Sequence, residues 1–226
     1  MQRDVQQLKL TISDATSVSA LLSRPAQPRA GLVLAHGAGA GMTHPFMEDV
    51  AKGLGERGVA TLRYQFPYME KGGKRPDPPA VAHAAVRAAM AEAARCCPGL
   101  PLFAGGKSFG ARMTSQAQAK RPLAGARGLV FLGFPLHPSG KPSSERADHL
   151  VDVRIPMLFV QGTRDKLAEP DLLKPVIDRL GTAATLQTVE GADHSFHVPA
   201  RSGRSDRDVM TEILDSVAAW IEKVQA

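Results

Sequence analysis

The segment at residues 106–110 (GKSFG) constrains the fold of this chain more than any other part of the sequence. The apolar run at 102–105 (LFAG) precedes it, and residues 111–120, whose composition favours a helix, follow it. This pattern predicts a strand, a sharp turn and a helix, with Ser108 at the apex of the turn. Gly106 and Gly110 fit such a turn, because a β-carbon at either position would meet neighbouring backbone. The turn would lift the Ser108 hydroxyl out of the sheet.

Two further polar residues also follow predicted strands. Asp165 lies in a loop just past the buried strand expected at 157–161, and His194 lies just past the strand expected at 185–189. Known catalytic sites include ones in which the nucleophile, acid and base occur in this order along the chain, here Ser108, Asp165 and His194. Three loops at one edge of a sheet can also meet in space. His197 stays an alternative base. We favour His194 because it leaves its strand through the tight turn at 191–193 (GAD).

A site of this kind also needs donors for a developing oxyanion. Residues 36–41 (HGAGAG) follow the buried apolar run at 32–35 (LVLA), and small residues let a backbone N–H approach a substrate oxygen. We assign one donor to the amide of Ala38, with Gly39 as the alternative. The second donor is the amide of Phe109, the residue after the nucleophile.

Taken together, the segments at 36–37 (HG), 106–110, 162–165 (GTRD) and 191–194 (GADH) resemble those of a small α/β-hydrolase, most closely the dienelactone-hydrolase-like branch. The segments at 66–70 (FPYME) and 133–138 (GFPLHP) resemble a subgroup of short predicted hydrolases whose eukaryotic relatives include a subunit of a histone-acetylation complex. The resemblance covers about residues 30 to 222.

This resemblance implies a serine hydrolase that cleaves a small carboxylic ester or thioester through an acyl-enzyme intermediate. Dienelactone hydrolases proper use cysteine where this chain has Ser108, which favours ordinary ester hydrolysis over dienelactone chemistry. The complex-subunit relative implies an alternative function, that of a binding or scaffold protein that retains the fold without turnover.

The rest of the chain predicts an α/β fold. Alternating apolar positions at 8–12 and 18–22 indicate an opening antiparallel hairpin, and strand-helix repeats follow it. We therefore expect a single α/β-hydrolase domain over residues 1–226, with a mostly parallel eight-stranded sheet and helices on both faces. The remaining strands are expected at 32–36, 60–64, 102–105, 129–133, 157–161 and 185–189, and helices at 44–57, 78–96 and 111–120. A short crossover helix is expected near Ser144 to Leu150, and a last helix from about Asp206, where Ser205 and Asp208 resemble a capping box.

Loops on either side of the serine turn are candidates for the substrate pocket. The loop at 64–74 carries Phe66 and Tyr68, and the loop after the strand at 129–133 carries His137. We predict that these three side chains border the pocket. The segment at 134–156 is too short for a lid domain, so we expect no lid.

Composition limits the partners and cofactors. The net charge is +6, but the basic residues are spread along the chain and only 5% of residues are aromatic, which argues against nucleic-acid binding. A dinucleotide fingerprint would need a glycine at Met42, and a P-loop would need one at Pro101. We therefore expect a small-molecule ester as partner, and no cofactor or metal.

The sequence also predicts a location in the cell. It contains no apolar run of the length that a membrane span requires and no signal-peptide pattern at its start, so we expect a cytoplasmic protein without membrane attachment. The adjacent Cys96 and Cys97 fit free thiols in a reducing compartment.

Overall fold

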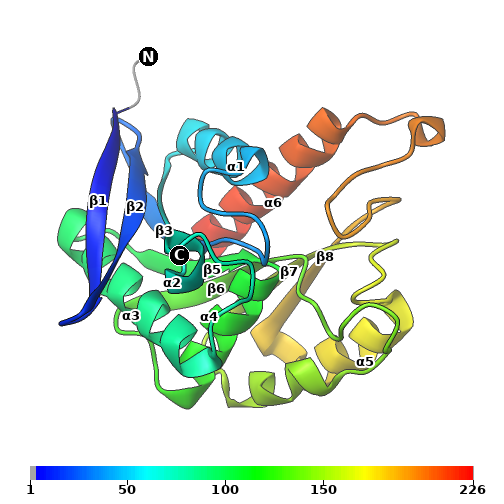
Figure 1. Ribbon diagram of the computed structural model, residues 1–226. Helices are drawn as coiled ribbons and strands as arrows, with labels where there is room; N and C mark the ends of the chain where they lie inside the picture. Colours follow the sequence, from blue (N-terminus) through cyan, green and yellow to red (C-terminus); the bar gives the residue numbers. More distant parts are fainter. Residues whose placement is uncertain (1–3, 226) are drawn as a thin grey trace.

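The computed structural model describes residues 4–225 and is built around one eight-stranded sheet (Figure 1). Its strands follow the order β1-β2-β4-β3-β5-β6-β7-β8. β1 pairs antiparallel with β2, β2 pairs antiparallel with β4, and the other neighbours are parallel. The predicted fold class is confirmed. The strands are β1 Asp4–Ser13, β2 Thr16–Arg24, β3 Ala30–Ala35, β4 Val59–Tyr64, β5 Leu102–Lys107, β6 Ala126–Leu132, β7 Met157–Gly162 and β8 Ala184–Val189.

Helices cover both faces of the sheet (Figure 1). Helices α1 (Pro45–Glu56) and α6 (Asp206–Gln225) lie on one face, and α3 (Pro79–Cys96), α4 (Phe109–Lys120) and α5 (Pro170–Leu180) lie on the other. The sequence patterns predicted no helix at α5 or at the short α2 (Pro67–Glu70). Three 3₁₀ segments complete the structure: η1 Glu145–Asp152, η2 Gly181–Ala183 and η3 Ala200–Ser202. Among the helices of residues 4–225, none has the length and apolar character needed to cross a bilayer.

The core consists of two hydrophobic layers, one on each face of the sheet. Leu32 and Leu34 of β3 pack in the layer under α1 and α6, whereas Val33 and Ala35 pack in the layer under α3 and α4. Every residue of β3 is buried. This explains why the parallel strands read as continuous apolar runs rather than alternating ones.

The turn between β5 and α4 has the geometry that its glycines suggested. Ser108 adopts φ 51° and ψ −111°, a region that non-glycine residues rarely occupy. A β-carbon added at Gly106 or Gly110 would collide with the carbonyl group of Ala35 in the neighbouring strand β3. The close approach of these two backbones therefore requires both glycines.

The segment between β6 and β7 contains η1 and irregular chain only. It crosses from one strand to the next and packs against α4 and α5. The crossover helix expected near Ser144 to Leu150 has 3₁₀ geometry. The fold thus has no lid domain between these strands.

The two glycines Gly110 and Gly55, both in helices, should respond in opposite ways to alanine. Gly110→Ala places a methyl group against the Ala35 carbonyl, so we expect the free energy of unfolding to fall by about 2 kcal/mol or more. At Gly55 in α1 an added methyl would meet nothing within 4 Å, so Gly55→Ala should raise it by roughly 0.5–1 kcal/mol. Urea unfolding of both variants measures this, and a stable Gly110→Ala variant would contradict the close approach.

Candidate active site

Ser108, His194 and Asp165 form a continuous hydrogen-bonded chain at the carboxyl end of the parallel strands. His194 Nε2 lies 2.9 Å from Ser108 Oγ, and His194 Nδ1 lies 2.7 Å from Asp165 Oδ2. Ser108 follows β5, Asp165 follows β7 and His194 follows β8. The carboxylate is fully buried, while the imidazole is 25% exposed. The structure thus brings together the three residues that the sequence selected.

The Asp165 carboxylate is held from several sides. Its Oδ1 accepts from the amide of Leu167 at 2.8 Å, and its Oδ2 accepts from Gln161 Nε2 at 2.5 Å. Gln161 is oriented in turn, because its Oε1 accepts from the amide of Phe134 at 2.9 Å. A buried carboxylate needs such donors. The orientation of Asp165 is therefore fixed before His194 adds its own hydrogen bond.

The loop after β3 is held by His36. His36 Nδ1 lies 2.8 Å from the Gly37 carbonyl oxygen, and the amide of Phe66 donates to His36 Nε2 at 3.0 Å. These two bonds place the proton on Nδ1 of a neutral ring. Burial lowers the pKa of His36 and so favours the same neutral form, against the raising effect of the Gly37 carbonyl. His36 therefore fastens this loop to the chain after β4.

Ala38 and Gly39 have different surroundings in this loop. Ala38 is exposed and lines the cleft beside Ser108. Burial raises the pKa of Tyr68, and the Gly39 amide, which faces the Tyr68 hydroxyl, lowers that pKa in part. Within residues 4–225 this hydroxyl has no partner in full hydrogen-bond geometry. Of the two candidate donors, Ala38 lines the cleft and Gly39 does not.

His197, the alternative base, lies away from the serine. Its ring is 62% exposed, and its Nδ1 lies 2.9 Å from Oδ2 of Asp206 at the start of α6. Hydrogen bonding to this carboxylate raises the pKa of His197. The His197 side chain therefore belongs to the surface at the beginning of α6, where Ser205 and Asp208 also form the capping box that the sequence predicted.

A cleft of about 410 Å³ opens beside Ser108. One wall comes from the loop after β3 and from the beginning of α1, and the other from the chain around His194. Leu167 contributes from the loop after β7. The lining residues are Gly37, Ala38, Ala40, His44, Phe46, Met47, Lys107, Ser108, Leu167, His194 and Ser195.

The predicted pocket border of Phe66, Tyr68 and His137 needs correction, because these residues lie outside the lining of this cleft. Phe66 is fully buried, with ring contacts to His36 and Phe109. Tyr68 is 6% exposed and packs edge-on against Phe109. His137 is 1% exposed and its Nε2 lies 2.6 Å from Glu169 Oε2. The three side chains support the loops around the site instead of bordering the cleft.

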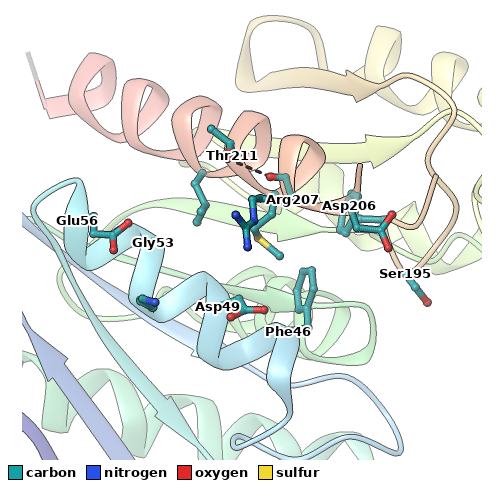
Figure 2. A pocket seen from close by; sticks show the side chains of 12 residues that line it. Phe46, Asp49, Gly53, Glu56, Ser195, Asp206, Arg207 and Thr211 are labelled. Atoms are coloured by element: carbon teal, nitrogen blue, oxygen red, sulfur yellow. Dashed lines mark hydrogen bonds between the residues drawn. The ribbon is translucent and has the colours of Figure 1, made fainter. Parts of the chain in front are cut away.

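A larger cleft, of about 710 Å³, runs between α1 and α6 (Figure 2). It adjoins the cleft beside Ser108, since Phe46 and Ser195 line both. Asp49 and Glu56 of α1 and Asp206 and Arg207 of α6 make much of its wall polar. Its lining contains no member of the Ser108, His194 and Asp165 chain. The smaller cleft, which contains Ser108 and His194, is therefore the candidate reaction site.

Lys107 and Gln161 are site residues that the sequence analysis missed. Lys107 lines the cleft, and its Nζ donates to the His194 carbonyl oxygen at 2.5 Å. Burial lowers the Lys107 pKa to about 8, although Asp165 and Asp193 favour its charged form. Lys107 and Gln161 are each a polar side chain at the carboxyl end of an otherwise apolar strand. That position was the sequence feature that could have identified them.

Comparison with known proteins identifies the family. Residues 28–222 match the family described as "Alpha/beta hydrolase domain", so this chain belongs to the α/β-hydrolases. The match includes all three members of the hydrogen-bonded chain.

Solved structures show the same fold over nearly the whole chain. The dienelactone hydrolase of Anabaena variabilis is similar with a TM-score of 0.77 and 18% identity, over 99% of each chain. A protein of Xanthomonas campestris, described as a serine hydrolase without lid, has a TM-score of 0.75 and 20% identity, over 97% of this chain and 96% of that one. The Pyrococcus furiosus esterase Pf2001 has a TM-score of 0.76 and 14% identity, over 98% and 93%.

The lowered pKa of Lys107 should appear in the pH dependence of stability. Between about pH 8 and 10.5 the unfolded chain keeps a proton on this lysine that the folded chain has lost, so stability rises with pH in that window. Below pH 8 the cost of burying the ammonium is fully present. Relative to Lys107→Met, the free energy of unfolding of the wild type should rise by roughly 2–3 kcal/mol across this window. Urea unfolding at several pH values measures this difference. Parallel curves of stability against pH for the wild type and Lys107→Met would contradict it.

Proposed function

We propose that this protein is a serine hydrolase that cleaves small carboxylic esters or thioesters. The observation that carries the proposal is the unbroken hydrogen-bond chain from Ser108 through His194 to Asp165 at the edge of an open cleft. Membership of the α/β-hydrolases supports hydrolase activity in general. The esterase and serine-hydrolase neighbours are consistent with this chemistry and supply an analogy for the substrate class.

In the proposed mechanism Ser108 Oγ attacks the carbonyl carbon of the substrate, and His194 Nε2 takes the hydroxyl proton. The bond to the alcohol or thiol then breaks, and His194 returns the proton to the leaving oxygen or sulfur. Water attacks the acyl-enzyme, loses its proton to His194 and releases the acid as Ser108 recovers that proton. Asp165 holds the imidazole in the tautomer with its proton on Nδ1 and stabilises the imidazolium that forms.

The amides of Ala38 and Phe109 are the proposed donors to the tetrahedral oxyanion. Phe109 is the first residue of α4, so its N–H lies at the positive end of the helix dipole. Ala38 is exposed at the cleft with a side chain too small to block an approaching carbonyl. Removing one such donor typically costs 10²–10³-fold in turnover.

The same cleft suggests the size of the substrate. Its lining combines small residues near Ser108 with apolar side chains such as Phe46, Met47 and Leu167. The chain between β6 and β7 provides no lid domain that could enclose a long acyl chain. We therefore propose short, soluble acyl esters as substrates.

A fluorophosphonate probe should label the wild type at Ser108. Ser108→Ala removes the only atom that the probe would modify, so labelling should disappear while the midpoint of thermal unfolding changes little. Gel fluorescence and intact mass report the label. Full labelling of the Ser108→Ala variant would refute the assignment of the nucleophile. An unlabelled wild type would favour a scaffold that retains the fold without turnover.

The two histidines provide a matched control for this experiment. His194→Ala should lower ester turnover by about 10⁴-fold or more, because the base is lost. His197→Ala should cost about ten-fold or less, since its ring contacts Asp206 and lies on the surface. A larger loss from His197→Ala than from His194→Ala would overturn the assignment of the base.

The proposed preference for short acyl groups can be tested with p-nitrophenyl esters from acetate to palmitate. We expect kcat/KM to stop rising beyond the short esters, because each methylene left outside the cleft forgoes about 0.8 kcal/mol of binding. Butyrate and octanoate locate the chain length at which the rise ends. A steady rise toward palmitate, or activation by an oil-water interface, would show that the cleft accommodates long chains.

A further inference from the structure

Lys107 links the serine turn directly to the loop that carries the base. It is the last residue of β5 and immediately precedes Ser108. Its Nζ donates to the carbonyl oxygen of His194 at 2.5 Å, so two segments 87 residues apart in the chain are joined beside the reacting atoms. A charge-assisted bond of this kind is stronger than one between neutral groups.

The Lys107 ammonium is confined on several sides. It lies 5.2 Å from the ring centroid of Phe196 and 6.0 Å from that of Phe46, and these two rings stack on each other. On another side lies Gly133, where an added β-carbon would come within 2.9 Å of Nζ and 3.5 Å of the His194 ring. The absence of a side chain at Gly133 leaves room for both groups. The lysine therefore has one well-defined position next to the imidazole.

The loop that carries His194 has other hydrogen bonds, but they run within the loop, to the loop after β7 and to the start of α6. It runs between β8 and η3 without regular secondary structure. Asp193 accounts for several of its local bonds: its amide donates to the His197 carbonyl and its Oδ1 accepts from the amide of Ser195. These bonds shape the turn but do not connect it to the nucleophile. The bond from Lys107 to the His194 carbonyl makes that connection through the backbone of the base itself.

We propose that Lys107 is a positioning residue that holds the backbone of His194 and thereby aligns its imidazole with Ser108. The inference rests on the proposed serine-hydrolase function. A displacement of about 1 Å between catalytic groups can cost about 10²-fold in rate. A tether at the residue next to the nucleophile would prevent such a displacement.

Charge also contributes to this arrangement. Asp165 and Asp193 face the ammonium from the loops after β7 and β8, together with the His194 ring that lies beside Gly133. Since the pKa of Lys107 is lowered to about 8, the ammonium and its charge-assisted bond are lost progressively above that pH. We therefore expect kcat to decline on the alkaline side as the tether weakens.

The test uses Lys107→Gln and Lys107→Met, two side chains of similar length that differ in hydrogen-bond donation. Lys107→Met should lower kcat by about 10- to 100-fold with KM within about three-fold, because alignment and not binding is lost. Lys107→Gln keeps an N–H donor, so its kcat should fall clearly less. Both variants should lack the alkaline decline near pH 8. Lys166→Met, at an exposed lysine of the nearby loop, is the control and should resemble the wild type.

A readout without turnover separates this inference from the proposed function. The proton in the His194 to Asp165 hydrogen bond should give a low-field NMR resonance in the wild type and in Lys107→Gln, and a weakened or shifted one in Lys107→Met. A wild type that is inactive and unlabelled but shows this pattern of resonances would refute the proposed hydrolase function and still support the tether by Lys107. Wild-type kcat and an unchanged resonance in Lys107→Met would overturn the tether. If Lys107→Met does not fold, Lys107→Gln decides through its alkaline profile: loss of the decline supports the role, and its retention refutes it.

Discussion

The close approach of β5 and α4 to the carbonyl of Ala35 is the contact on which the site depends. Gly106 and Gly110 permit it, because a side chain at either position would collide with that carbonyl. The same approach places the Ser108 backbone at φ 51°, so that its hydroxyl stands at the strand ends beside the loop after β3. Ser108 and one proposed oxyanion donor thus come together through backbone contact, and the surrounding sheet holds the strained turn.

Around this contact, the polar groups are arranged in supporting pairs. Gln161 and the Leu167 amide hold Asp165, and Asp165 orients the imidazole of His194. His36 connects the loop after β3 to the chain at Phe66. Each of these bonds lies in a buried or partly buried setting, where an unpaired polar group would be costly. The site is therefore held by the same requirement for hydrogen-bond partners that stabilises the fold.

The aromatic residues of the loop after β4 support the site from below. Phe66 and Tyr68 pack edge-on against Phe109, and Phe66 also contacts His36. The open cleft is bordered by other apolar side chains, among them Phe46, Met47 and Leu167. The lining of the cleft and the support of the turn are thus divided between two sets of apolar side chains, and Ser108 and His194 both line the open cleft.

Local patterns were sufficient to predict the order of strands along the chain, the serine turn and the three residues Ser108, Asp165 and His194. These patterns are apolar runs, glycine spacing and position after a strand. The sequence also indicated the helix start at Ser205. Which side chains border the cleft depends instead on how the loops pack in the folded protein. Phe66 turns inward against His36, whereas Phe46 of α1 and Lys107 reach the site. The direction of a loop side chain depends on partners distant in sequence, and no local pattern contains that information.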